Sequence, residues 1–260
     1  MKRKDSKHLN DIDSRKRILN DETDFDTVET YKSIRTNIMF SMPKTDEGKV
    51  IVITSSAPGE GKTTTSINLA LTFAQMGASV LLVDCDLRKS RIHRYLDLER
   101  GDGVSNVLCG FSDFDKAVQR NIRENLDCLT SGDTPPNPAE LLESPEFGRL
   151  LSEMKKKYDY IFIDTPPTTV VTDAMIVMRS CSGVAVVIRQ DMTSYDLLDI
   201  TMDNVAKAGA KMLGFIVLDA DERSKKYYGK KGYYKKKYNY GYGYGYGYGV
   251  KEKTKSEEQV

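Results

Sequence analysis

The chain has 260 residues, of which 39% are hydrophobic and 30% are charged, and its formal net charge is +1 at neutral pH. This length can bury a sizeable core, and one α/β domain with appendages is the simplest arrangement that fits it. The near balance of charge hides an asymmetry, because residues 223 to 260 hold 11 Lys or Arg against 3 Asp or Glu. That end of the chain is therefore a separate basic segment, and the remainder is acidic.

Four cysteines lie far apart and form no C-x-x-C pair: Cys85, Cys109, Cys128 and Cys181. This spacing predicts reduced, buried thiols rather than a disulfide framework or a zinc site. The basic start of the chain lacks the apolar stretch of a signal peptide, and no run approaches the length of a membrane-spanning helix. These patterns together predict a cytoplasmic protein.

The first part of the chain divides into an arm and a helix. Residues 1 to 25 are highly charged, and we expect them to form a mobile arm because they have too few apolar groups to offset the entropy of ordering. Residues 26 to about 41 have the apolar spacing of an exposed amphipathic helix. Asp26 and Glu29 form the expected capping box at its start.

From residue 49 onward, apolar runs typical of buried strands alternate with helical patterns. Strands are predicted within residues 49–55, 79–86, 158–167, 183–190 and 212–220, with a weaker candidate at 126–132, and helices within 61–77 and 138–157. This alternation predicts an α/β domain over residues 26–222, with a mostly parallel sheet covered by helices on both faces. The Tyr-, Lys- and Gly-rich residues 223–260 are predicted to be disordered.

The first predicted strand ends in "SSAPGEGKTTT", residues 55 to 65. Gly59 and Gly61 allow backbone N–H groups to point inward, Lys62 can reach the β and γ phosphates of a nucleotide, and Thr63 can hold Mg²⁺. The strict phosphate-loop pattern begins with Gly where this chain has Ser56, but the strand–loop–helix context favours the P-loop NTPase fold. The predicted nucleotide-binding residues are Ser56, Ala57, Pro58, Gly59, Glu60, Gly61, Lys62, Thr63 and Thr64.

Acidic side chains follow two further predicted strands. Asp84 and Asp86 lie two residues apart in "DCDLR", and Asp164 ends a strand in "FIDTPP". Because the carboxyl ends of parallel strands meet at one edge of the sheet, all three are expected near the phosphates. Asp86 is the predicted base and Asp84 the metal contact, with the reverse assignment and simple helix capping left open. Thr63, Asp84 and Asp164 form the predicted magnesium site.

These motifs together resemble those of the bacterial tyrosine kinases, cytoplasmic enzymes that regulate capsule and exopolysaccharide synthesis. The resemblance runs from about Glu29 to the tail. "SSAPGEGKTTTSINLA" is similar to the family's Walker A motif, "LLVDCDLRKSRIH" to Walker A′, "IFIDTPP" to Walker B and "NPAELLES" to the segment between them. The resemblance implies a protein tyrosine kinase that uses ATP and Mg²⁺, with Lys62, Asp84 and Asp86 as its catalytic residues.

The resemblance also gives the tail a role, because its tyrosines resemble the family's autophosphorylation cluster. Ten of the 15 tyrosines lie in the last 34 residues. Each phosphate adds a charge of about −1.5 to −2, so phosphorylating half of the cluster would reverse the charge of the tail and, as a hypothesis, separate neighbouring subunits. The predicted acceptors, phosphorylated between subunits, are Tyr227, Tyr228, Tyr233, Tyr234, Tyr238, Tyr240, Tyr242, Tyr244, Tyr246 and Tyr248.

The family's helix motif E-x-x-R-x-x-R, which contacts the neighbouring subunit of a ring, is represented here by Glu29, Lys32 and Arg35. Lys32 keeps the charge of the usual Arg but loses its bidentate geometry, which predicts a weaker ring. The resemblance further implies a transmembrane activator, a polysaccharide co-polymerase whose cytosolic tail recruits the kinase to the inner face of the membrane, and a cognate tyrosine phosphatase. No nucleic acid partner is expected.

Two other functions stay open on the sequence alone. A positioning ATPase, like the partitioning and septum-placement ATPases, would hydrolyse ATP without forming phosphotyrosine, although the partitioning enzymes carry a second Lys where this chain has Ala57. A nucleotide-gated scaffold would use the Tyr-rich tail to bind polymer, nucleic acid or membrane. Asp219 stands where related proteins often place Asn, so the residues that recognise adenine are unassigned.

Overall fold

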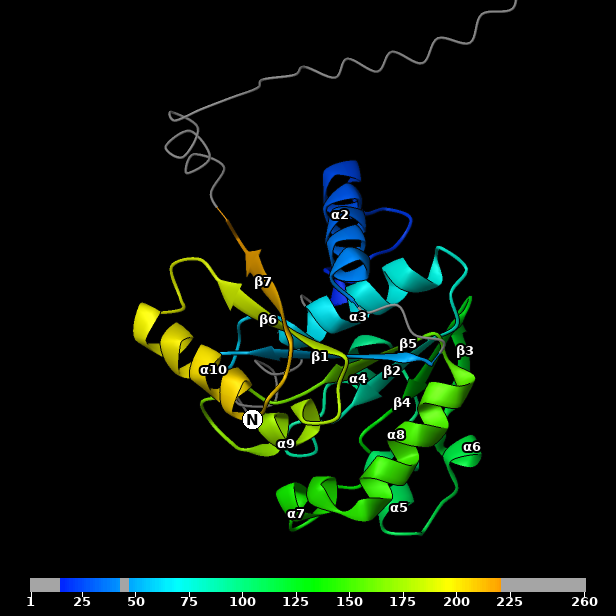
Figure 1. Ribbon diagram of the computed structural model, residues 1–260. Coiled ribbons are helices and arrows are strands. Elements are labelled where there is room, and N and C mark those ends of the chain that lie inside the picture. Colours follow the sequence, from blue (N-terminus) through cyan, green and yellow to red (C-terminus); the bar gives the residue numbers. More distant parts are fainter. Residues whose placement is uncertain (1–14, 43–46, 221–260) are drawn as a thin grey trace, which may run out of the picture. The chain divides into compact units, whose positions relative to one another are not determined.

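The computed structural model describes residues 15–42 and 47–220, which form a seven-stranded sheet in the order β3-β4-β2-β5-β1-β6-β7 (Figure 1). Every neighbouring pair is parallel except β3 and β4, which are antiparallel. The strands are β1 (Lys49–Ser55), β2 (Val80–Asp84), β3 (Gln119–Arg123), β4 (Leu126–Leu129), β5 (Tyr160–Asp164), β6 (Gly183–Arg189) and β7 (Met212–Leu218).

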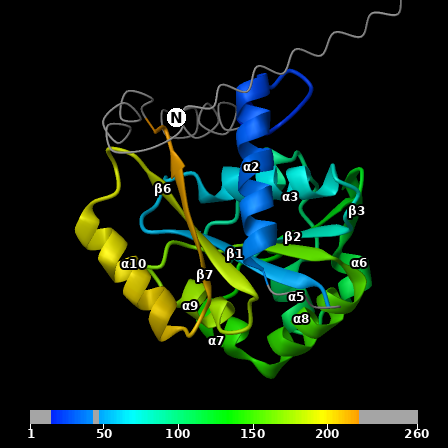
Figure 2. The ribbon, with the colours of Figure 1, turned by 45° about the horizontal axis from the view of Figure 1, so that its top comes forward.

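Helices cover both faces of this sheet, as predicted for the P-loop NTPase fold (Figures 1 and 2). They are α2 (Phe25–Ser41), α3 (Lys62–Ala74), α4 (Ile92–Tyr95), α5 (Val104–Leu108), α6 (Phe114–Ala117), α7 (Pro138–Glu143), α8 (Pro145–Lys157), α9 (Asp173–Met178) and α10 (Tyr195–Lys207). No helix in the part of the chain that the structure describes is long and apolar enough to cross a membrane.

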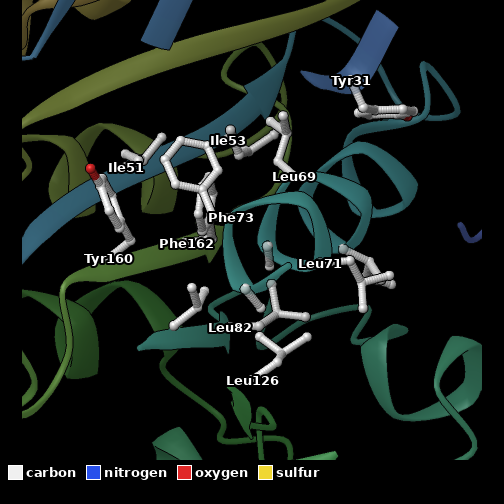
Figure 3. Packing of buried hydrophobic residues seen from close by; sticks show 14 of the residues in the cluster. Tyr31, Ile51, Ile53, Leu69, Leu71, Phe73, Leu82, Leu126, Tyr160 and Phe162 are labelled. Carbon is white, nitrogen blue, oxygen red and sulfur yellow. The ribbon is translucent and has the colours of Figure 1, made fainter. Parts of the chain in front are cut away.

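The core divides into two layers because side chains of each strand alternate between the two faces of the sheet. In β1, Ile51 and Ile53 face the layer that contains α3, whereas Val50 and Val52 face the layer that contains α8 and α9. Figure 3 shows the first layer, in which Phe73 of α3 packs edge-on against Phe162 of β5 at a ring distance of 5.0 Å. Helix α3, which follows the predicted phosphate loop, therefore packs directly on the central strands.

The chain ahead of α2 differs from the predicted mobile arm. Ile18 and Leu19 are buried in the core layer of α3. The side chain of Asn68 bonds the backbone on both sides of Ile18, accepting from the Leu19 amide at 2.9 Å and donating to the Arg17 carbonyl at 2.9 Å. Packing of Ile18 and Leu19 and the two bonds of Asn68 thus attach this segment to α3, which the sequence did not predict. Residues 1–14 lie outside the described residues.

Three further predictions about local structure need correction. Helix α2 begins one residue earlier than predicted, and its cap is Asp24, whose carboxylate accepts from the Thr27 amide at 2.8 Å, rather than Asp26. The predicted helix over 138–157 is two helices, because Ser144 is extended and Pro145 starts a new one. Among the cysteines, Cys85 and Cys128 are buried, but Cys109 is exposed.

Candidate active site

The phosphate loop lies between β1 and α3, and both predicted glycines adopt the backbone that requires them. Gly59 has φ +90° and Gly61 has φ +93°. A Cβ atom on Gly61 would lie 2.4 Å from Cδ1 of Leu218, so the end of β7 packs against the loop where only glycine fits. Ser56, at the position of the pattern's first Gly, needs no glycine because its φ is not positive. Its buried hydroxyl accepts instead from Thr201 of α10 at 2.8 Å.

Glu60 is the loop residue whose side chain is directed into the protein. Its carboxylate is fully buried. One carboxylate oxygen accepts from the Ala57 amide at 2.8 Å and the other from the hydroxyl of Thr193. The carboxylate therefore folds the loop back on itself and joins it to the segment after β6.

A groove with a volume of about 1290 Å³ runs along the carboxyl ends of the strands. Its walls include six of the nine predicted nucleotide-binding residues, and Ser56, Ala57 and Glu60 lie behind them. Asp86 of the predicted acidic pair also faces this groove. The loop residues on its wall are Pro58, Gly59, Gly61, Lys62, Thr63 and Thr64.

Lys62 and the predicted acids meet at one end of the loop. The Lys62 ammonium lies 3.1 Å from a carboxylate oxygen of Asp86 and 3.4 Å from one of Asp164. The same Asp164 oxygen accepts from the Thr63 hydroxyl at 2.7 Å, and its other oxygen accepts from Ser66 at 3.1 Å. Asp84 pairs in register with Asp164 on the neighbouring strand. The sequence thus identified the cluster but missed Ser66, which lies three residues after Thr63, on the same side of α3.

Asp84 is positioned differently from Asp86. Its carboxylate is fully buried and accepts from the backbone amides of Asp86 at 3.1 Å, Arg91 at 3.2 Å and Ile92 at 3.3 Å. The helix-capping alternative therefore describes Asp84, which holds the loop that carries Asp86. Only Asp86 of the pair reaches the groove.

The charges of this cluster do not balance. Burial, together with the neighbouring carboxylates of Asp164 and Asp86, raises the pKa of Asp84 to about 8. Burial also raises the pKa of Asp164, against the opposing effect of Lys62. Burial alone would lower the pKa of the Lys62 ammonium, but the three surrounding carboxylates outweigh it and raise that pKa. The carboxyl groups outnumber the single ammonium, and a bound divalent cation would favour their ionised forms.

Arg88, two residues after Asp86, joins the loop that follows β2 to helix α9. Its guanidinium holds the fully buried carboxylate of Asp173 in two hydrogen bonds of 2.8 and 3.0 Å. Asp173 is the first residue of α9, and no motif in the sequence points to it. This pair connects the loop of Asp86 to α9.

The motif of the predicted ring helix makes contacts within its own chain. The Lys32 ammonium lies 2.7 Å from the carboxylate of Glu29 on the same helix. Arg35 donates a hydrogen bond of 2.7 Å to the carbonyl of Thr72, which docks α2 onto α3. Arg35 therefore has a structural role that its place in the motif did not predict.

Comparisons with known proteins agree with this geometry. A family model described as an AAA domain matches residues 48–212. The tyrosine-protein kinase YwqD of Bacillus subtilis is 41% identical over 211 residues, which cover 81% of this chain and 87% of the relative. The solved kinase domain of the Escherichia coli tyrosine kinase ETK is 30% identical, has a TM-score of 0.70, and aligns over 84% of this chain and 80% of that one.

This chain belongs to the bacterial tyrosine kinase family. A third similar protein, the chimerical protein CapA2B2, is 37% identical with a TM-score of 0.69, covering 73% of this chain and 83% of its own. By contrast, the septum site-determining protein MinD of Pyrococcus horikoshii, solved with Mg-ADP, is 28% identical with a TM-score of 0.57 over 68% of this chain and 73% of that one. The resemblance to the tyrosine kinases is confirmed, and the alternative of a positioning ATPase is not favoured.

Proposed function

We propose that this chain is a protein tyrosine kinase that transfers the γ-phosphate of ATP, in the presence of Mg²⁺, to tyrosines 227–248 of a neighbouring copy. The observation that carries the proposal is the cluster in which Lys62 lies within 3.4 Å of both Asp86 and Asp164 beside the phosphate loop. Membership of the tyrosine kinase family separates this function from ATP hydrolysis alone.

The phosphate loop and Lys62 bind the phosphates of the nucleotide and stabilise the charge on the transferred phosphoryl group. Backbone N–H groups around Gly59 and Gly61 and the first turn of α3 offer donors to the phosphates, because the N-terminal amides of a helix lack intrahelical partners. The Lys62 ammonium stabilises the charge that develops on the transferred phosphoryl group. These groups are preorganised by Glu60 and Leu218 behind the loop.

The acceptor hydroxyl needs a base, and Asp86 is the acid of the Lys62 cluster that faces the groove. A tyrosine phenol has an ordinary pKa of about 10, so a carboxylate within hydrogen-bond reach helps by taking its proton during transfer. The ion pair with Lys62 and the Lys89 amide, which donates to Asp86 at 3.0 Å, orient this carboxylate. We therefore assign Asp86 as the base.

The residues present fit a magnesium ion. The Thr63 hydroxyl and the carboxylates of Asp164 and Asp84 are hard oxygen ligands, and the excess of carboxyl groups over ammonium groups favours a dication. When bound, Mg²⁺ would supply positive charge against the phosphate groups of the nucleotide. Thr63 and Asp164 would hold the ion. Asp84, which lies beside Asp164 on the neighbouring strand, would contribute a further carboxylate.

The acceptor tyrosines lie outside the described residues, so their role rests on the sequence and the family. One structural fact supports it: Leu218 and Asp219, at the end of β7, line the groove just before the tail begins. We further propose a ring-like homo-oligomer that loosens when the tail is phosphorylated. A transmembrane activator would bind it at the inner face of the membrane, and a tyrosine phosphatase would reverse the reaction. The cellular role would be control of capsule and exopolysaccharide synthesis and export.

The decisive experiment measures phosphotyrosine by intact mass after incubating the full chain with Mg-ATP, mixed with the cytosolic tail of a candidate activator. We expect several phosphate additions on the wild type, mapping to residues 227–248. Two controls should show none: Lys62→Met, and a chain that ends at Asp221. If the wild type hydrolyses ATP but gains no phosphate, the positioning ATPase is correct. If tail deletion abolishes polymer or membrane binding that Lys62→Met retains, the scaffold is correct.

A further inference from the structure

The segment between β5 and α9 gives the groove an apolar wall. Four of its residues line the groove, and we call them the apolar shelf: Pro166, Pro167, Val170 and Val171. The two prolines are buried, whereas Val170 is 57% exposed. Strand β5 is the direct neighbour of β2, so the shelf and the loop that carries Asp86 follow adjacent strands at the same edge of the sheet.

Hydrogen bonds attach the shelf to the end of β1, where the phosphate loop begins. The Thr54 hydroxyl donates to the Pro166 carbonyl at 2.9 Å, and the Thr168 amide donates to the Ser55 carbonyl at 3.0 Å. Both bonds lie just ahead of Val170 in the chain. The backbone that presents this exposed valine to the groove is therefore anchored, and its exposure is a feature of the fold.

The shelf is also connected to the loop that carries the assigned base. Asp173, three residues after Val170, binds the guanidinium of Arg88, which itself lines the groove. On the same loop, Asp86 lies 3.1 Å from the ammonium of Lys62. An apolar surface, the assigned base and the phosphate-binding ammonium thus lie on adjacent loops of one groove.

We propose that the apolar shelf, and Val170 in particular, holds the aromatic ring of the acceptor tyrosine while the phenol hydroxyl is directed at Asp86. An aromatic ring buries a large apolar area against such a wall, whereas a water molecule or a serine hydroxyl gains nothing from it. Val170 is therefore a specificity-determining residue that favours transfer to tyrosine over transfer to water.

The chemical step on this acceptor is balanced by the groups already described. The phenol oxygen forms a bond to the γ-phosphorus as the bond between that phosphorus and the departing ADP breaks, and the phenol proton passes to Asp86. Contact between the ring and the shelf takes no part in this exchange, and it acts by positioning the hydroxyl. The inference rests on the proposed kinase function.

The test measures steady-state phosphorylation of a synthetic peptide with the sequence of residues 241–249 by the full chain, with Mg-ATP and the activator tail present. Val170→Ser should raise the KM for the peptide about tenfold, because two methyl groups no longer contact the ring. Val170→Ile keeps an apolar, β-branched side chain and should retain the KM of the wild type. The dissociation constant of Mg-ADP, measured by calorimetry, should be the same in all three proteins.

A second readout is the fraction of the released γ-phosphate that reaches tyrosine rather than water. We expect this fraction to fall in Val170→Ser and to stay at the value of the wild type in Ile200→Ser. The second variant is the matched control, because Ile200 is 48% exposed and lies on α10, outside the groove.

An unchanged KM for the peptide in Val170→Ser would overturn the inference, as would an equal loss in Val170→Ser and Val170→Ile. Weaker binding of Mg-ADP by Val170→Ser would also overturn it, because Val170 would then act through the nucleotide. Failure of the proposed function looks different, since the wild type itself would then form no phosphotyrosine on the peptide or on its own chain. Phosphotyrosine in the wild type with no effect of Val170→Ser removes only the role of the shelf.

Discussion

At the scale of single residues, the buried carboxyl of Asp84 makes the stability of the nucleotide-free chain depend on pH. Its pKa is about 8 in the folded protein against an ordinary 3.8. Between those values the folded chain keeps a proton that the unfolded chain has lost, so stability falls as pH rises, by up to about 1.4 kcal/mol per pH unit from this group.

We therefore expect the free energy of unfolding in urea, measured with a metal chelator present, to decline between pH 5 and pH 8 more steeply for the wild type than for Asp84→Asn. The variant cannot titrate at this position but keeps an acceptor oxygen for the backbone amides. Parallel pH profiles for the two proteins would show that Asp84 is ionised in the fold.

Thr193 is a second residue that we expect to affect stability. Its hydroxyl donates to the buried carboxylate of Glu60 and so joins the phosphate loop to the segment after β6. Thr193→Val preserves the shape but leaves a buried carboxylate oxygen without this donor, and we expect a loss of about 1–3 kcal/mol in the free energy of unfolding. Thr193→Ser retains the hydroxyl and should lose much less. Equal stability of the two variants would exclude a stabilising role for this contact.

At the scale of elements, Asn68 connects α3 to the chain ahead of α2 through its two backbone bonds. Asn68→Ala removes both, so we expect residues 15–24 to detach locally and tryptic cleavage after Arg17 to accelerate several-fold. Asn204→Ala is the control, because Asn204 makes a single side-chain bond, to the Thr168 carbonyl, on a different helix. Unchanged cleavage in Asn68→Ala would mean that burial of Ile18 and Leu19 alone holds this segment.

The elements that could be predicted from sequence are those with a strong local pattern. The five long parallel strands are continuous apolar runs. The motif residues Lys62 and Asp86 follow β1 and β2, and Asp164 ends β5. Strand β3 was missed because it is a polar edge strand with an exposed middle. The segment at 15–24 was missed because its partner, Asn68, is about 50 residues away. Thr193 and Asp173 were missed for the same reason, since tertiary contacts alone give them a role.

At the scale of the whole molecule, the proposed subunit contact of the charged motif on α2 can be tested separately from folding. The Lys32 side chain is 43% exposed and forms an ion pair with Glu29 one turn away. Such a pair on one helix contributes about 0.2–0.5 kcal/mol to the stability of a monomer. Arg35 is engaged by the Thr72 carbonyl of its own chain. Within the motif, Lys32 is therefore the position at which self-association can change with little effect on the fold.

We expect Lys32→Arg to tighten self-association about fivefold, because a planar guanidinium can bind a carboxylate of a neighbouring copy through two bonds where an ammonium makes one. Its thermal midpoint under dissociating conditions should match the wild type. Sedimentation velocity of the full chain with the activator tail measures the first quantity. Lys116→Arg is the matched control, because Lys116 also pairs three residues away, with Asp113, on the distant helix α6. If both variants self-associate more tightly, the effect comes from replacing any surface Lys by Arg and is not specific to α2. If Lys32→Arg does not tighten self-association, the subunit contact lies elsewhere than α2.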